Sequence, residues 1–250
     1  MSLFDRFNLG AGFKKYFQIE AASDERVRDD VFRVRHEVYC EELKFEPERP
    51  DRRETDRYDT HSVHCLLRGA SAPHPPVGCT RLVLANPADL AAPLPFEETC
   101  AKTLDRSIID PAKLDRRRIA EVSRLAVRSA YRRRRGEKHV AVAINDDDYN
   151  ASDEQPRFPY IPIGLYLGAV ALAVRNDVDT LFVLTEPRLA SHFSKLGVDL
   201  TQIGGPVDHR GIRVPSMMDV QSIIKGLRFM VKPIWRAVEA QINASSSPPR

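Results

Sequence analysis

The middle of the chain has the clearest alternation of apolar and polar positions, from residue 119 to residue 128. Successive side chains of a strand point to opposite sides, so this alternation predicts a strand. One predicted face carries Ala120, Val122, Arg124 and Ala126, and the other carries Glu121, Ser123, Leu125 and Val127. A cationic loop, 131–136, follows where the strand must leave the sheet. Such a loop either binds a pyrophosphate through backbone N–H groups and charge, or is simply solvated.

Other segments have the apolar spacing of helices. After a capping sequence at 23–25, apolar residues recur at Val27, Val31, Val34 and Val38, which predicts an amphipathic helix. A longer stripe from Val220 to Val238, with cations beside it, predicts a helix near the C-terminus. The remaining predicted strands cover 16–21, 62–67, 77–84, 180–185, 200–203 and 212–214, and the remaining predicted helices cover 96–104, 163–175 and 187–196.

These elements predict one α/β domain, because no internal repeat and no clear linker divides them. We expect an N-terminal arm at 1–12, the domain at 13–218 with an exposed insertion at about 145–159, an amphipathic helix at 219–242 and a disordered tail at 243–250. A highly charged segment between Glu46 and Thr60 is too long for a simple connection, so we expect it to be functional or disordered.

Composition excludes some classes of protein. The 250 residues are 42% hydrophobic and carry a net charge of only +3, which makes no case for a nucleic-acid binder. Cations cluster at 116–118 and 132–135, so an acidic partner or a phosphorylated ligand is favoured there. The four cysteines are far apart, which predicts reduced thiols in a cytoplasmic protein and no metal site. We expect no secretion, because the N-terminal residues do not form a charged-then-apolar leader. The longest apolar run, 161–174, is too short and too interrupted by glycine to span a bilayer.

A series of motifs at consistent spacing resembles a known family. Residues 31–39 resemble the first-helix motif of the autoinducer (N-acyl-homoserine lactone) synthases, with Arg35 and Tyr39 at its arginine and aromatic positions. Phe45 stands where that family carries tryptophan. The paired aspartates, the Gly-x-x-Arg-Leu strand and the Glu-x-Ser-Arg strand of that family match Asp56 with Asp59, the strand containing Arg81, and the run from Glu121 to Arg124.

This resemblance covers residues 24 to about 215 and implies a GNAT-like fold, with a central mixed sheet flanked by helices. It also implies an N-acyltransferase that moves an acyl group, expected to be long, from an acyl carrier protein or CoA thioester to the amine of an amino acid or related small molecule. No tightly bound cofactor is expected. The segment 61–64, the insertion and the basic C-terminal helix are closer to the N-acyl amino acid synthase-like acyltransferases of bacterial PEP-CTERM/exosortase systems.

The resemblance assigns a catalytic set of Glu121, Ser123 and Arg124. Acyl transfer needs a neutral amine, so Glu121 is the candidate general base, with a structural partnership to an arginine as its alternative role. The expected substrate-binding residues are Arg35, Tyr39, Phe45, Asp56, Asp59, His64 and Arg81. Their arginines and aspartates form an ion-pair network that either contacts substrate or only braces the charged segment. His64 is either a second base or a hydrogen-bonded packing residue.

The acyl donor is expected at the end of the central strand. By analogy with the GNAT fold, Leu125, Ala126 and Val127 offer backbone groups to the pantetheine. Arg128, Arg132 and Arg133 suit its phosphate or the acidic surface of an acyl carrier protein, or else they are solvated.

Two other functions stay open from the sequence. One is an ordinary acetyl-CoA-dependent GNAT enzyme, and the other is a non-enzymatic module that binds an acyl carrier or a membrane surface. The C-terminal helix either packs on the domain or contacts lipid through its cationic side. We therefore expect a cytoplasmic protein, free or peripheral at the inner membrane.

Overall fold

One mixed eight-stranded sheet organises the computed structural model, which describes residues 9–132, 159–187, 193–194 and 196–245. Its strands are β1 (Phe17–Ala21), β2 (Ser62–Gly69), β3 (Pro76–Leu84), β4 (Ile119–Val127), β5 (Thr180–Thr185), β6 (Thr201–Gln202), β7 (Val207–Asp208) and β8 (Ile212–Asp219). They run in the order β1-β2-β3-β4-β5-β8-β6, and β7 pairs with β8. Among these strands, β4 and β5 form the one parallel pair. The α/β, GNAT-like architecture expected from the sequence is therefore present.

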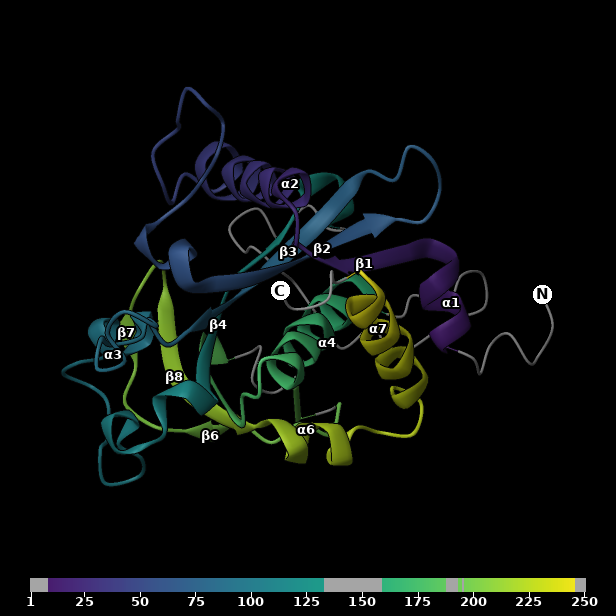
Figure 1. The fold of residues 1–250 in the computed structure, drawn as a ribbon. Helices are drawn as coiled ribbons and strands as arrows, with labels where there is room; N and C mark the ends of the chain where they lie inside the picture. The colour runs from purple at the N-terminus through teal and green to yellow at the C-terminus, as the bar shows by residue number, and fades with distance from the viewer. Residues whose placement is uncertain (1–8, 133–158, 188–192, 195, 246–250) are drawn as a thin grey trace.

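Helices cover both faces of this sheet (Figure 1). The α-helices are α1 (Leu9–Tyr16), α2 (Glu25–Arg35), α3 (Pro95–Thr99), α4 (Tyr160–Arg175), α6 (Val220–Gly226) and α7 (Lys232–Ala244). A π-helix, η1 (His36–Glu42), continues α2, and short 3₁₀ helices are η2 (Arg57–His61), η3 (Pro111–Lys113), η4 (Arg116–Arg118) and η5 (Ser129–Tyr131). The helices α4 and α7 pack in the core on one face, and α2 packs on the other.

The helix α2 forms for the reasons its sequence suggests. The Asp24 side chain accepts a hydrogen bond of 2.9 Å from the Val27 backbone N–H and so caps the first turn. The valine stripe is buried from Val27 to Val38, and it packs against Leu66 and Cys79 of the sheet. The chain then continues directly into η1, which brings Tyr39 beneath the charged segment.

A β-bulge in β4 changes the faces predicted for that strand. Arg124 has a φ of +51°, and the pairing register with β3 shifts so that β4 holds one extra residue there. Before the bulge, Val122 packs in the core beneath α4; beyond it, Leu125 takes that face and Ala126 packs against α2. The strict two-residue alternation is therefore wrong beyond Ser123, since the extra residue reverses it.

The C-terminal stripe forms two helices where the sequence predicts one. The helix α6 ends at Gly226, residues 227–231 form a turn, and Pro233 lies in the first turn of α7. The apolar side of α7 packs against α1, α4 and β1. In addition, the Gln241 side chain accepts a hydrogen bond of 2.8 Å from the Ile19 N–H at the edge of the sheet. The stripe therefore belongs to the core of the domain.

Several other expectations concern the ends of the chain and the insertion. Residues 9–12 lie in α1, so the expected arm is helical there; Gly10 is so close to Pro233 that a Cβ would lie 2.5 Å from its carbonyl oxygen. Residues 1–8, 133–158 and 246–250, which include most of the expected arm, insertion and tail, lie outside the described residues, as does most of the predicted helix at 187–196. All four cysteines are free and buried. Across the described ranges, no helix has the length and apolar character to cross a membrane.

Candidate active site

The divergence of β4 and β5 opens a pocket in the sheet. Their pairing ends at Val122 and Val183, although both strands continue beyond these residues. A pocket of about 380 Å³ lies at this point and is lined by residues of both strands, including Ser123, Leu125 and Thr185. Because the strands part, ligand atoms can reach their backbone groups from within the sheet.

The pocket is lined from both faces of the sheet, and its two ends differ chemically. Toward α4 its walls are apolar: Tyr166 packs against Phe193 with ring centroids 4.5 Å apart, and its hydroxyl lies 3.5 Å from the Met218 sulfur. On the opposite face the walls are charged and include Asp56, Arg81 and Arg124. An amphiphilic ligand that passes through the sheet would match this polarity.

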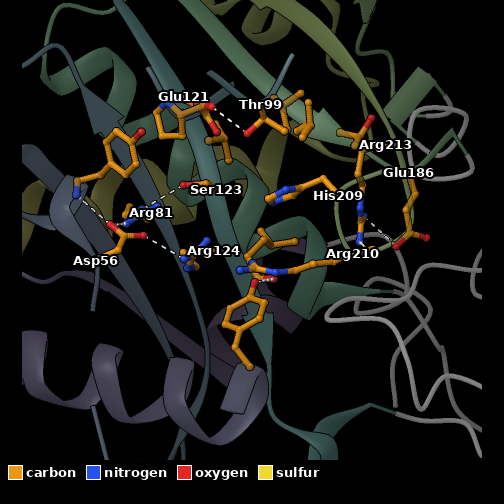
Figure 2. A pocket seen from close by; sticks show the side chains of 18 of the residues that line it. Asp56, Arg81, Thr99, Glu121, Ser123, Arg124, Glu186, His209, Arg210 and Arg213 are labelled. Atoms are coloured by element: carbon orange, nitrogen blue, oxygen red, sulfur yellow. Dashed lines mark hydrogen bonds and ion pairs between the residues drawn. The ribbon is translucent and has the colours of Figure 1, made fainter. Parts of the chain in front are cut away.

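Glu121 lies in the charged half of the pocket and is only 4% exposed (Figure 2). Its Oε2 accepts a hydrogen bond of 2.6 Å from the Phe96 backbone N–H. Burial raises the pKa of Glu121 to about 8, and the Phe96 hydrogen bond and the positive charge of Arg81 offset only part of that effect. A carboxyl with a pKa near neutrality can both take up and release a proton at physiological pH.

Ser123 and Arg81 are neighbours across the β3–β4 pair. The Arg81 Nε donates to the Ser123 Oγ over 3.0 Å, and its Nη1 donates to Asp56 and Asp59 over 2.6 and 2.9 Å. Since Oγ accepts from Arg81, the hydroxyl hydrogen of Ser123 remains available to a ligand in the pocket. Arg81 itself is 1% exposed and holds the charged segment on the sheet.

Arg35 and Asp59 form the buried part of the ion-pair network. Arg35 is fully buried and donates to Asp59 through both Nη atoms, at 2.7 and 3.0 Å, and to Glu54 through Nε at 2.5 Å. Burial alone would raise the pKa of Glu54, but the charges of Arg35 and Arg124 lower it to about 2. Neither Arg35 nor Asp59 lines the pocket. Their contacts are those of a brace for the charged segment.

Arg124 connects this network to the pocket. From the bulge of β4 its Nη2 donates to Glu54 at 3.1 Å and to Asp56 at 3.0 Å, and its guanidinium lies over the Tyr39 ring, 5.6 Å from the centroid. The left-handed backbone at this residue aims the side chain at the charged segment. Strain at a non-glycine residue beside a pocket is typical of a functional position.

His64 is buried among these charges but outside the pocket lining. Its Nε2 lies 3.6 Å from the Asp59 Oδ1, and its buried Nδ1 has no hydrogen-bond partner among the described residues. Burial and the nearby Arg35 lower the pKa of His64 to about 3. It is therefore neutral at physiological pH, and its position does not favour a role as a second base.

The two aromatic residues of the first motif lie at the pocket wall. The Tyr39 hydroxyl donates to the Leu125 carbonyl over 3.0 Å, and burial raises the pKa of Tyr39 to about 12. Phe45 packs beside Tyr39, with centroids 6.4 Å apart, and the Arg210 guanidinium lies over the Phe45 ring, 5.8 Å from its centroid. Both rings line the pocket, as does Leu125. Ala126 and Val127 pair with β3 and do not line it.

The cations expected to bind the donor phosphate are paired with acidic residues. The Arg128 Nε donates to both oxygens of Glu37, at 2.8 and 2.9 Å, and Arg132 pairs with Glu42. The two glutamates come from η1, and neither arginine lines the pocket. Arg133 lies outside the described residues. A phosphate at Arg128 or Arg132 would have to compete with these carboxylates.

Sequence reasoning missed part of the site. Glu54 accepts hydrogen bonds from both Arg35 and Arg124. Its position in the charged segment, beside the two motif aspartates, was the sequence feature that could have indicated this role. The turn between β7 and β8 adds His209 and Arg210, and the start of β8 adds Arg213. These residues face Glu121 and Ser123 across the pocket (Figure 2), and no sequence motif reveals them. The Thr185 hydroxyl, buried beside the pocket, has no hydrogen-bond partner among the described residues.

Comparison with known proteins agrees with this arrangement. Residues 34–141 match the acetyltransferase (GNAT) domain family. This part of the chain, a little under half of its length, therefore resembles a GNAT acetyltransferase domain. Its neighbours among solved structures include acyl-homoserine lactone synthases and an N-acyl amino acid synthase, so the chain has the fold of the proteins that its motifs resemble. No curated protein matches the chain by sequence.

Three of these neighbours show how much of the chain the structural likeness covers. The acyl-homoserine lactone (AHL) synthase LasI shares 17% identity with a TM-score of 0.54, over 85% of this chain and 95% of that chain. The CoA-dependent acyl-homoserine lactone synthase BjaI, with SAM and isopentyl-CoA, shares 19% with a TM-score of 0.53, over 88% and 98%. FeeM, an N-acyl amino acid synthase from uncultured soil microbes, shares 14% with a TM-score of 0.51, over 86% and 96%. At these identities the likeness establishes the fold.

Proposed function

We propose that this GNAT protein is an N-acyltransferase that moves an acyl group from a CoA or acyl carrier protein thioester to the amine of an amino acid or related small molecule. The observation that carries the proposal is the pocket between β4 and β5, with the buried carboxyl of Glu121 at its charged end. The names of the synthase neighbours indicate substrates of this kind, and these neighbours share the fold.

In the proposed reaction, Glu121 takes a proton from the acceptor ammonium directly or through a water molecule. The neutral nitrogen then attacks the thioester carbonyl carbon, a C–N bond forms, and the C–S bond breaks. The amine's second proton goes to the sulfur, which leaves as a thiol. A pKa of about 8 suits Glu121 to this role, because a stronger acid would not hold the proton and a weaker acid would rarely be ionised.

Ser123 is the proposed donor to the developing oxyanion. Its Oγ already accepts from Arg81, so its hydrogen points toward other partners in the pocket. A fixed donor aimed at developing charge is typically worth ~10²–10³-fold in rate. Thr185, whose hydroxyl lacks a partner among the described residues, is placed to bind a polar group of the donor arm.

The polarity of the pocket supports an amphiphilic product. Tyr166, Phe193 and Met218 suit an aliphatic chain, and the 380 Å³ volume leaves room for more than an acetyl group. Across the pocket, Arg210 and Arg213 suit an acceptor that bears a carboxylate, although each already contacts a glutamate. We therefore favour an amino acid as acceptor, as in a PEP-CTERM/exosortase-associated N-acyl amino acid synthase.

The identity of the donor is a separate proposal. Positive charge at the end of β4 would suit the phosphopantetheine phosphate and an acidic carrier protein, but Glu37 and Glu42 neutralise Arg128 and Arg132. Carrier-protein recognition would then depend on Arg133 and the cations that follow it in the sequence. Reaction in the cytoplasm, where both donors occur, is part of this proposal.

The acetyl-CoA enzyme and the binding module are the alternatives. A binding module has no need of a buried carboxyl with a pKa near 8 inside its pocket, and an acetyl donor would leave the apolar half unfilled. The test is mass spectrometry of organic extracts from cells that overproduce the protein or its Glu121→Gln variant. An N-acylated amine present only with the unmodified protein is the expected result. If no such N-acylated amine is found and the purified protein transfers acetyl groups, the protein would instead be an acetyl-CoA-dependent enzyme.

A further inference from the structure

The turn between α6 and α7 exposes apolar side chains that do not pack in the hydrophobic core. Phe229 is 90% exposed and Met230 is 53% exposed, and they are adjacent in the chain. The other strongly exposed large hydrophobic residues of the described chain are isolated: Tyr16, Ile108, Val174 and Ile212. Isolated exposed apolar residues are ordinary, but an adjacent pair at the tip of a turn is the usual mark of an interaction site.

This turn is held rigidly against the domain. Leu227 and Val231, on either side of it, are 3% and 2% exposed and lie in the main core. The Arg228 N–H donates to the Leu196 carbonyl over 3.2 Å, and the Val231 N–H donates to the Arg228 carbonyl over 2.8 Å. Since the backbone is anchored at both ends, Phe229 and Met230 cannot fold back onto the core without breaking these contacts. Their exposure is therefore built into the fold.

Positive charge surrounds the apolar tip. Lys225, Arg228, Lys232 and Arg236 are all exposed, and the run 220–238 contains no acidic residue. None of these four cations forms an ion pair within the part of the chain that the structure describes. An apolar tip surrounded by unpaired cations is complementary to an anionic lipid surface, where the tip enters the acyl boundary and the cations meet phosphates.

We propose that the α6–α7 turn (residues 227–231) is a membrane-contact site that inserts Phe229 and Met230 into an anionic lipid surface. Two side chains are far too small for a stable protein dimer, which needs roughly 800 Å² from each partner, and four like charges would repel a second copy. The sequence left open whether a single C-terminal helix packs its apolar stripe on the domain or contacts lipid through the cations beside that stripe. That stripe is buried in the core, so the contact moves to the turn.

The turn also lies on the α4 side of the sheet, as does the apolar half of the pocket. Its neighbour Leu196 follows Phe193, which lines that half, by three positions in the sequence. Lipid contact at the turn would therefore bring the apolar end of the pocket to the membrane side of the protein. This orientation does not depend on which acyl acceptor the protein uses.

Co-sedimentation of the full chain with vesicles tests the proposal. We expect the unmodified protein to sediment with phosphatidylcholine vesicles that contain phosphatidylglycerol and to remain in solution with phosphatidylcholine alone. The double variant Phe229→Ser/Met230→Ser should bind the anionic vesicles at least about tenfold more weakly, because two inserted side chains are lost. The variant Lys225→Gln/Arg228→Gln/Lys232→Gln should also bind more weakly, and added salt should weaken the unmodified protein in the same way.

The control is Ile108→Ser, which removes an exposed apolar residue from a turn with nearby acids Asp105 and Asp110. It should bind vesicles as the unmodified protein does, and all variants should unfold at similar temperatures since only exposed side chains change. Failure of the unmodified protein to bind anionic vesicles overturns the proposal, as does undiminished binding by the double variant. Concentration-dependent dimerisation that the double variant abolishes, without vesicle binding, would assign the turn to a second copy.

Discussion

Replacement of Glu121 by glutamine tests the proposed chemistry most directly, because the structure predicts opposite effects on rate and on stability. Glutamine has nearly the same shape as glutamate and keeps an oxygen that can accept the hydrogen bond from the Phe96 N–H, now 2.6 Å long. It removes the carboxyl whose pKa burial raises to about 8. The fold should therefore be retained while the base is lost.

The size of the rate effect follows from the role. A general base is typically worth ~10²–10⁴-fold, which corresponds to about 3–5 kcal/mol of transition-state stabilisation. For the unmodified enzyme, kcat/KM should rise with pH through about 8, as Glu121 ionises. In the Glu121→Gln variant this rise should disappear, and the remaining rate should depend only on ionisation of the amine.

The effect on stability has the opposite sign. Glu121 has a higher pKa in the folded protein than the ordinary value of 4.5, so the unfolded chain loses its proton first. The free energy of unfolding should therefore fall as pH rises from about 4.5 to about 8 and then level off, with a total on the order of a few kcal/mol. Glutamine cannot ionise, so the variant should lack this fall and be at least as stable as the unmodified protein at pH 8.

The assay is thiol release from acyl-CoA in the presence of the amine, with urea unfolding of the same samples. Glu97→Gln is the matched control, since Glu97 is also buried but pairs with Arg116 at 2.8 Å and does not line the pocket. It should retain turnover within a few-fold. Turnover of Glu121→Gln within a few-fold of the unmodified enzyme across this pH range would remove Glu121 from the base role.

Three further predictions concern the network and the pocket. Arg35→Met should lower the free energy of unfolding by about 3–5 kcal/mol, measured in urea, because it leaves the buried carboxylates of Glu54 and Asp59 uncompensated; a loss below about 1 kcal/mol would contradict a buried brace. The pKa of Glu54 is lowered to about 2, so its contribution to the free energy of unfolding should be complete above pH 4.5 and be lost as pH falls from about 4.5 to 2. In Glu54→Gln, the free energy of unfolding measured in urea should change less with pH over this range. Tyr166→Leu should enlarge the apolar half of the pocket and shift kcat/KM toward longer acyl donors, measured over a chain-length series; an unchanged preference would place the chain elsewhere.

Local patterns in the sequence predicted much of the framework correctly. The capping aspartate and valine stripe of α2 and the strand Thr180–Thr185 depend mainly on residues close in the chain, and the structure has them where the pattern predicts. Several motif residues, among them Arg81, Glu121 and Ser123, also converge on one pocket. The family resemblance predicted that these residues lie in one site. Residue composition and spacing alone predicted only strands and charged loops.

Other features depend on contacts between segments far apart in the chain. The bulge at Arg124 is a feature of the pairing between β4 and β3, where the register shifts by one residue, and it reverses the face of the β4 residues that follow. Glu37 comes more than 90 positions before Arg128 and neutralises a cation that the local sequence leaves unpaired. The stripe after Val220 breaks into two helices at Gly226, where the backbone lies so close to Gly197 that a Cβ would be 2.5 Å from its carbonyl oxygen.

The pKa of Glu121 also depends on contacts between distant segments, which the sequence alone does not reveal. The sequence determined that a carboxyl follows Ala120 on a strand, but its burial comes from α3 and β5, which pack around it from distant parts of the chain. Removal of water by that packing is what raises the pKa of Glu121 toward neutrality. Which residues carry acid or base groups is therefore set by the sequence, whereas their proton affinity is set by the tertiary contacts that exclude solvent.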